Sequence, residues 1–305
     1  MRVALHGPTI SVPRFLERAV VTLNVEGRSA RVLVARGGRA VDWNETLLEE
    51  GLVREGVIID PEGVGSVLKG LLKPNRIWGT RLMASVTGLR SIPRLLELPH
   101  MSAQMMEAAV SREAKREMPV PLQDIYLSWQ ALGDGNGKQR VFALGVPRDT
   151  LDPLLRALAI AGSRPYAVDI KPLALARAVN RREAIVANVE PESADIIVVT
   201  EGMPAIMRTV ASRSGTSTRD ESIERFRGEL ARTVKFYSDT HRQEPLSLDT
   251  PLFITGSLAP EAAETMSLDG ELPFLVEPLA PLLECPPDLP VHSYAVNIGL
   301  ALKEV

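Results

Sequence analysis

Features that would point to several classes of protein are scarce or missing in this sequence. Its 305 residues include a single cysteine, Cys285, which excludes an internal disulfide framework and fits a reducing compartment. No apolar run approaches the roughly 20 residues of a membrane-spanning helix, and no signal peptide is recognisable. The net charge is −3 and the basic residues are scattered, so we expect no nucleic-acid partner.

One stretch of the chain occurs twice without gaps. The matched residues are Asn24, Val25, Glu26, Ser29, Ala30 and Gly38 in the first copy and Asn188, Val189, Glu190, Ser193, Ala194 and Gly202 in the second. Each copy predicts a β-hairpin, in which a buried strand, a polar turn and an apolar strand precede a glycine turn and a third strand. The wide spacing indicates a duplicated half-domain, because solenoid repeats have periods of roughly 20–50 residues.

The segment between the two copies changes its pattern. Residues 51–60 predict a strand that leads into a helix capped by Asp60. Residues 90–170 predict the order strand, helix, strand, strand, helix, strand, with the first helix from Ser102 to Met118 and the second capped by Asp149 or Thr150. This segment interrupts the material between the copies, so it predicts an inserted subdomain.

Two matched hairpins with an insertion between them resemble the actin and sugar-kinase superfamily, and in particular its PilM family of type IV pilus assembly proteins. The blocks that carry the resemblance are Gly51–Asp60, Glu97–Pro99 with Ser102, Glu113 followed by Pro119, Tyr166–Leu175, Glu229–Tyr237 and Ile298–Lys303. The resemblance implies an α/β, actin-like fold, a duplicated ribonuclease H-like unit of two lobes with an inserted subdomain. The implied division is 20–89 for the first half of lobe 1, 90–170 for the inserted subdomain, 171–182 for the return helix of lobe 1, and 183–305 for lobe 2 with a small insertion at about 211–250.

The superfamily also implies ATP with Mg²⁺ between the lobes, held by an Asp–x–Gly sequence at the end of each first strand. Here Asn24 and Asn188 stand at the Asp positions, and a neutral amide is a poor ligand for a hard cation. Glu26 and Glu190 stand at the Gly positions and bring negative charge beside a polyanion. Like charges about 4 Å apart repel by roughly 4 kcal/mol at an effective dielectric constant near 20. The adenosine position reads Gly256-Ser257, half of the usual glycine pair.

We therefore expect a degenerate nucleotide cleft with no cofactor, no metal and no catalytic residue. The candidate residues of this cleft are Asn24, Glu26, Gly27, Arg28, Ser29, Asn188, Glu190, Ser193, Gly256, Ser257 and Gly299. Each Asn is expected to satisfy turn amides, and each Glu to be solvated or paired with Arg28 or Arg31. The alternative is that Mg²⁺ sits between Glu26 and Glu190 and restores ATP binding.

The resemblance implies a scaffold rather than an enzyme. PilM proteins capture the cytoplasmic N-terminal peptide of the single-span membrane protein PilN, which links the pilus alignment complex to cytoplasmic ATPases. It implies a cytoplasmic protein, peripheral at the inner face of the membrane through its partner, with self-association open. An extended apolar peptide would gain from leucine and methionine surface and from a free strand edge. The candidate groove residues are Leu95, Leu96, Leu98, Pro99, Met105, Met106, Glu113, Pro119 and Pro121.

Three other readings of the resemblance stay open. The first is an ATP-binding, filament-forming or membrane-associated protein similar to FtsA, which sedimentation with and without ATP would detect. The second is a sugar or acetate kinase, which Asn24 and Asn188 disfavour because both acidic positions are lost. The third is the cytoplasmic part of a type II secretion protein of the GspL kind, which shares the fold and continues into a membrane helix.

Overall fold

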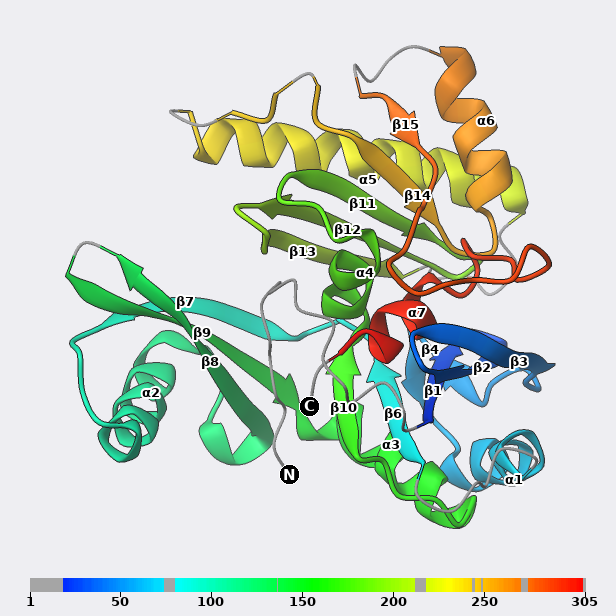
Figure 1. The fold of residues 1–305 in the computed structure, drawn as a ribbon, viewed down its shortest axis with the longest axis horizontal. Coiled ribbons are helices and arrows are strands. Elements are labelled where there is room, and N and C mark those ends of the chain that lie inside the picture. The colour runs from blue at the N-terminus through cyan, green and yellow to red at the C-terminus, as the bar shows by residue number, and fades with distance from the viewer. Residues whose placement is uncertain are drawn as a thin grey trace.

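The computed structural model describes residues 19–73, 80–135, 137–211, 218–242, 245–247, 249–269 and 274–303. They form two lobes, each built on a five-stranded sheet, and a smaller three-stranded sheet beside the first lobe (Figure 1). The predicted α/β architecture of two lobes with an inserted unit is confirmed. None of the described helices is long and apolar enough to cross a membrane.

The first sheet has the strand order β10-β6-β1-β2-β3. Its strands are β1 (Val20–Glu26), β2 (Ser29–Arg36), β3 (Arg39–Leu47), β6 (Arg81–Val86) and β10 (Ala167–Ile170). Two helices, α1 (Pro61–Leu72) and α3 (Arg148–Ile160), cover one face through an apolar core that includes Leu23, Leu68 and Leu158. This burial of alternate strand residues against helical stripes is what the period-2 and period-3.6 patterns predict.

The N-terminus of α1 is formed as predicted. The carboxylate of Asp60 accepts the backbone N–H groups of Glu62 and Gly63 at 3.0 and 3.1 Å, and Pro61 occupies the first turn. The preceding segment differs from the predicted single strand, because it forms a short hairpin of β4 (Val53–Arg54) and β5 (Val57–Ile58). Its two turn residues have positive φ, 52° at Glu55 and 74° at Gly56, which is the backbone that a tight two-residue hairpin requires.

The second sheet repeats the order of the first, as β13-β12-β11-β14-β15. Its strands are β11 (Ala184–Val189), β12 (Ser193–Thr200), β13 (Met203–Ala211), β14 (Leu252–Thr255) and β15 (Val276–Glu277). The helices α5 (Arg219–Thr240) and α6 (Ala259–Asp269) cover its outer face. Both sheets carry a register shift at the matched places Val34/Ala35 and Val198/Val199, which supports the predicted duplication. The range 211–250, expected to hold a small insertion, contains α5, which packs directly on this sheet.

The last helix of each lobe packs on the other lobe. Helix α4 (Lys171–Val179) follows β10 and contacts β6 and β10 of the first sheet as well as β11, β12 and β13 of the second. Helix α7 (Ala295–Ala301) contacts β1, β2 and β6 of the first sheet. The two helices cross at the centre of the molecule (Figure 1). A Cβ at Gly299 would lie far inside van der Waals contact with the Ala174 carbonyl. Gly299, predicted as a cleft residue, is therefore needed for this close helix crossing.

The inserted unit is a three-stranded sheet in the order β7-β9-β8 with one helix. Its elements are β7 (Ile92–Leu98), α2 (Ala103–Glu117), β8 (Ile125–Gly135) and β9 (Lys138–Pro147), with a short 3-10 turn at Leu122–Asp124. The helix predicted from Ser102 to Met118 extends from Ala103 to Glu117, and Ser102 is its N-cap, since its hydroxyl accepts the Met105 N–H. The tip of the unit reaches the second lobe, where Arg140 pairs with Glu201 at 3.4 Å.

The predicted inserted range, 90–170, includes two elements that pack with the first lobe. Strand β10 pairs in parallel with β6, and α3 packs against α1. Helix α3 begins at Arg148, so Asp149 lies in its first turn and neither Asp149 nor Thr150 is its N-cap. The sequence pattern could not separate these elements from the insertion, because a strand and a helix have the same local pattern whichever sheet they join.

Candidate functional site

The turns of the two repeated hairpins face each other across the lobe junction, as the duplication predicts. Glu26 and Glu190, at the ends of β1 and β11, are buried, with 4% and 5% of their surface exposed. Gly27, at φ 50°, lies opposite the side chain of Glu192 from the other turn. Arg28 is exposed, and its guanidinium lies 4.0 Å from the carboxylate of Glu50. The two turns are thus in direct contact.

A lysine that the sequence patterns did not single out joins the two lobes. Lys171, the first residue of α4, is 1% exposed, and its Nζ atom contacts Glu26 of the first hairpin and Asp195 Oδ2 of the second, the latter at 3.0 Å. The remaining oxygens are also bonded. Ser193 donates to Glu26 Oε1 at 2.7 Å, and Thr209 donates to Asp195 Oδ1 at 2.6 Å.

A second ionic group lies beside the first. Arg31 of β2 donates from Nη1 to Glu190 Oε1 at 2.8 Å and from Nε to Glu45 Oε1 at 3.0 Å. Ser257 donates to the other Glu190 oxygen at 2.5 Å. Of the two predicted arginine partners for the glutamates, Arg31 is confirmed, and it bonds the glutamate of the opposite lobe.

The charges in this junction are only partly balanced. Burial alone would lower the pKa of Lys171, but Asp195 and Glu26 raise it above its ordinary value, so the lysine is protonated at neutral pH. Burial raises the pKa of Glu26; Lys171 opposes this, while Glu190 and Asp195 add to it. Three buried carboxylates, Glu26, Glu190 and Asp195, therefore share two buried cations, Lys171 and Arg31.

Asn24 and Asn188 occupy equivalent places, but they do not bond turn amides as expected. The side-chain oxygen of Asn24 accepts from Ser85 at 2.7 Å, and that of Asn188 accepts from Thr255 at 3.2 Å. Both donors lie on the parallel strand next to the first strand of each hairpin, β6 and β14. The asparagines lie within the strands rather than in the turn. Their side chains therefore reach a hydroxyl on the neighbouring parallel strand more easily than a backbone amide of the turn.

The two residues at the predicted adenosine position, Gly256 and Ser257, are hydrogen-bonded within the chain. The Gly256 N–H donates to the His292 carbonyl at 2.8 Å, and the Ser257 hydroxyl is bonded to Glu190. Gly256 has φ 96°, and a Cβ there would collide with the Val189 backbone. The glycine is required for this close approach of β14 to the second hairpin.

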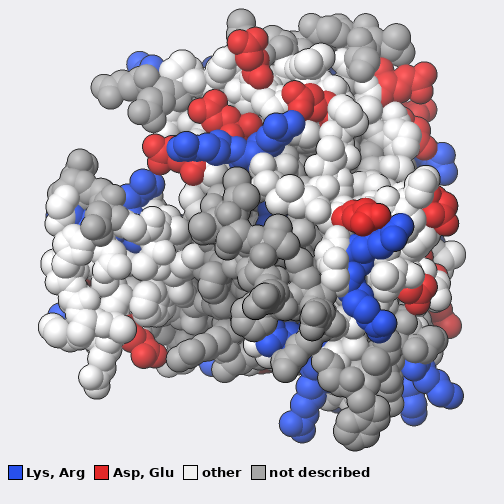
Figure 2. Space-filling model, in the orientation of Figure 1, with Lys and Arg blue, Asp and Glu red and all other residues white. Residues whose placement is uncertain are grey.

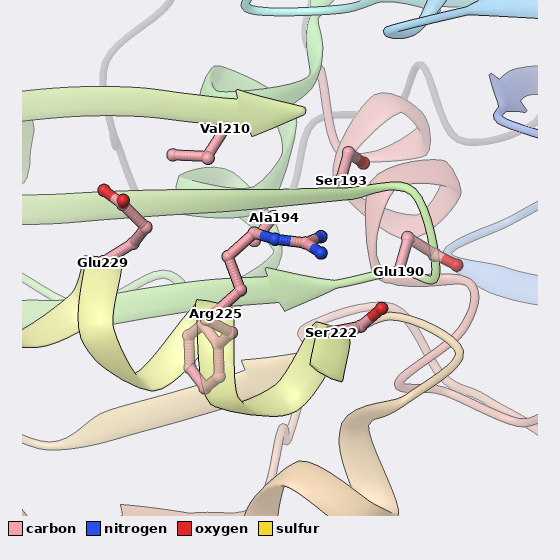
Figure 3. Close-up of a pocket in the computed structure, with 8 residues that line it drawn as sticks. Glu190, Ser193, Ala194, Val210, Ser222, Arg225 and Glu229 are labelled. Carbon is pink, nitrogen blue, oxygen red and sulfur yellow. The ribbon is translucent and has the colours of Figure 1, made fainter. Parts of the chain in front are cut away.

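The residues present do not fit a magnesium nucleotide. The two carboxylates that Mg²⁺ would have to bridge are already paired with internal cations, Glu26 with Lys171 and Glu190 with Arg31. A small pocket beside the second turn, lined by Glu190, Ser193, Ser222 and Arg225, has a volume of about 10 Å³, which is at the limit for one water molecule (Figure 3). No group of three or more metal-ligating side chains occurs in the described part of the chain.

The residues that sequence reasoning missed are Lys171 and Asp195. Asp195 occupies the same place in the second repeat as Arg31 in the first, directly after Ser-Ala, so the two copies carry opposite charges at one matched position. The two residues do not pair with each other: Arg31 bonds Glu190, and Asp195 bonds Lys171. Lys171 gave no signal in the local sequence, because it lies 145 residues from Glu26 in the chain.

The predicted peptide-groove residues divide into two groups. Leu96, Leu98 and Met106 are buried in the core of the inserted unit, with 5%, 6% and 2% exposed, so they are not available to a partner. Leu95 and Met105 are 54% and 62% exposed. The remaining candidates are accessible or partly accessible: Pro99, Glu113, Pro119 and Pro121.

Several solved structures resemble this chain in fold. No family model and no curated protein matches. A chain of a PilM–PilN type IV pilus biogenesis complex is similar, with a TM-score of 0.75 and 20% identity over 95% of this chain and 98% of that one. The ethanolamine utilization protein EutJ from Carboxydothermus hydrogenoformans is similar with a TM-score of 0.54 and 13% identity, over 97% and 92% of the two chains.

A third similar structure is the cytoplasmic domain of EpsL, an inner membrane component of the type II secretion system of Vibrio cholerae. Its TM-score is 0.52, with 15% identity over 94% of this chain and 96% of that one. Together with the duplicated sheets and exchanged helices, these likenesses define the class: the chain has the predicted actin-like fold. Within that class, the predicted resemblance to PilM is confirmed as a likeness of fold that extends over the inserted unit.

Proposed function

We propose that this protein is a scaffold of type IV pilus assembly that binds the cytoplasmic N-terminal peptide of a PilN-like single-span membrane protein. The observation that carries the proposal is the likeness to the PilM–PilN complex, which includes 95% of this chain. Through such a partner the protein would lie at the inner face of the cytoplasmic membrane, where the cytoplasmic pilus ATPases are further candidate partners.

The proposed scaffold neither binds nor hydrolyses ATP. Support comes from the junction, where the side chains of Glu26, Glu190 and Ser257 and the Gly256 N–H are all bonded within the chain. Binding a nucleotide would require breaking these buried bonds, and removing one partner of a buried ion pair costs about 3–5 kcal/mol. A thermal-shift measurement with ATP and Mg²⁺ tests this part. We expect no change in melting temperature, and a clear rise would contradict it.

The surface also fits a protein or peptide partner better than a polyanion. On the face in Figure 2, acidic and basic side chains of the described residues are interspersed, without a broad field of either sign. The accessible candidates on the inserted unit, Leu95 and Met105, are apolar and exposed. An extended peptide that covers them would gain from burying apolar area.

The direct test is titration of the partner's N-terminal peptide against the purified protein, followed by calorimetry or fluorescence anisotropy. We expect saturable binding in the micromolar range and none for a scrambled peptide of the same composition. Failure to bind at high micromolar concentration would remove the proposal. Sedimentation with and without ATP is the companion measurement, since ATP-dependent pelleting would favour the filament-forming alternative instead.

A further inference from the structure

Two buried cations, Arg31 and Lys171, join the two lobes of this molecule, and Lys171 is the one that bridges two buried carboxylates from different lobes. Lys171 contacts Glu26 at the end of β1 and Asp195 on β12, so its ammonium group lies between carboxylates of the first and second lobes. Ser193 and Thr209 bond the carboxylate oxygens that face away from the lysine. In many proteins a divalent metal ion bridges two buried carboxylates in this way.

The arrangement depends on the charge of Lys171. Without it, the carboxylates of Glu26 and Asp195 would face each other in a buried environment, with Glu190 close by. Like charges in such surroundings repel strongly, and the repulsion is relieved by protonation, by separation of the lobes or by another cation. Arg31 cannot replace the lysine, because it is already bonded to Glu190 and Glu45.

We propose that Lys171 is a permanent cationic latch that holds the two lobes closed without a ligand and takes the place of a metal ion between Glu26 and Asp195. The proposal rests on the absence of nucleotide in the proposed function but not on peptide binding. It makes a specific chemical claim: once the lysine is removed, the same carboxylates form a site for a divalent cation.

The test measures the distance between the lobes in Lys171→Met. Spin labels are placed at Glu50 in the first lobe and Lys235 in the second, whose side chains are 78% and 77% exposed, in a Cys285→Ser background. We expect one narrow distance distribution in the parent protein and an added population of longer distances in Lys171→Met. The melting temperature is expected to fall by about 5–10 °C.

The matched control is Lys303→Met. The side chain of Lys303 is fully buried like that of Lys171, and it forms an ion pair with Asp169 at 3.0 Å, but this pair does not connect the two hairpins. It is expected to lower the melting temperature without adding longer distances. Millimolar Mg²⁺, which does not disturb the spin labels, is expected to restore the narrow distribution in Lys171→Met and to raise its melting temperature by several degrees. It should change neither in the parent protein nor in Lys303→Met.

A second variant keeps the test decisive if Lys171→Met does not fold. Lys171→Met with Glu26→Gln and Asp195→Asn removes the repulsion and retains hydrogen-bonding groups. We expect this variant to fold, to show the longer distances, and to be unaffected by Mg²⁺ because its ligands are neutral. A narrow distribution in both Lys171 variants, or the same Mg²⁺ response in the parent protein, would overturn the latch. Peptide titration is independent of these outcomes, so failure of the latch is distinguishable from failure of the scaffold.

Discussion

At the scale of single residues, backbone proximity determines which glycines can be replaced. Gly299 lies at the α4–α7 crossing, where a Cβ would overlap the Ala174 carbonyl, whereas a Cβ at Gly70 in α1 would meet nothing within 4 Å. Gly299→Ala is therefore expected to lower the free energy of unfolding by more than about 3 kcal/mol, as overpacking against backbone cannot relax by rotamer change.

Gly70→Ala is the control for that substitution. Alanine is favoured over glycine in a helix by roughly 0.8–1 kcal/mol, so this variant is expected to be as stable as the parent or more stable. Urea unfolding of the two variants measures both effects. Equal stability of Gly299→Ala and the parent protein would show that the two helices can separate at no cost.

The buried carboxylate of Asp169 is a second single-residue feature, and it makes the stability of the protein depend on pH. Burial alone would raise its pKa, but Lys303 and Arg177, at 3.0 and 2.9 Å, outweigh burial and hold the pKa below the ordinary 3.8. A carboxylate with a depressed pKa contributes stability that is present above its unfolded pKa and is lost as the pH falls through its folded pKa. Asp169→Asn is expected to cost about 3–5 kcal/mol at pH 7, because two cations lose their partner.

The difference in the free energy of unfolding between the parent protein and Asp169→Asn should be constant from about pH 5 to 7 and should shrink below about pH 4. Unfolding in denaturant at several pH values measures it. Asp149→Asn is the control: its side chain is 65% exposed and pairs with Arg90 on the surface, so solvent screening limits its cost to less than about 1 kcal/mol. If the loss of stability in Asp169→Asn were independent of pH, the depressed pKa of Asp169 would be contradicted.

At the scale of elements, two neighbouring residues of β7 allow the contribution of this strand to stability to be measured separately from its contribution to binding. Leu96 is buried against α2, while Leu95 on the opposite face is 54% exposed. Leu96→Ala is expected to cost about 2–5 kcal/mol of stability, and Leu95→Ala to stay within about 0.5 kcal/mol of the parent.

If the proposed peptide covers β7, Leu95→Ala should weaken its binding about tenfold, since an apolar side chain of this size contributes about 1.5–3 kcal/mol when buried. Titration of the peptide against the variant gives this ratio. Met105→Ala, which changes an equally exposed residue on α2, shows whether the helix also takes part. An unchanged Kd for Leu95→Ala would place the groove elsewhere.

The elements also show what local sequence can and cannot specify. Both hairpins, the Asp60 and Ser102 caps and the element order of residues 90–170 follow from apolar period and capping residues, which act within a few positions. Local sequence does not specify that α3 and β10 belong to the first lobe, because this depends on which sheet each element joins. The burial of Leu96 and Leu98 likewise depends on which face of β7 packs against α2. In the junction, Glu26 and Glu190 were identified by position, but the pairing with Lys171 is a long-range contact that no local pattern contains.

At the scale of the whole molecule, the exchange of α4 and α7 ties the two lobes into one cooperative unit. Helix α4 follows the first sheet and packs on both sheets, whereas α7 follows the second sheet and packs on the first. The two helices share a core that includes Leu175, Val186, Ile197 and Leu300. Neither sheet can keep its inner face covered when the other lobe unfolds. We therefore expect a single calorimetric transition with equal van't Hoff and calorimetric enthalpies.

Hydrogen exchange extends this prediction to individual strands. Amides of β1 in the first lobe and β11 in the second should exchange with the same free energy of opening, because the loss of either sheet exposes the shared helices. Two resolved transitions, or a β11 that opens at much lower free energy than β1, would show that the lobes are independent. If the two lobes unfold together, the ionic contact of Lys171 at the hairpins stabilises both sheets and not only the local turn.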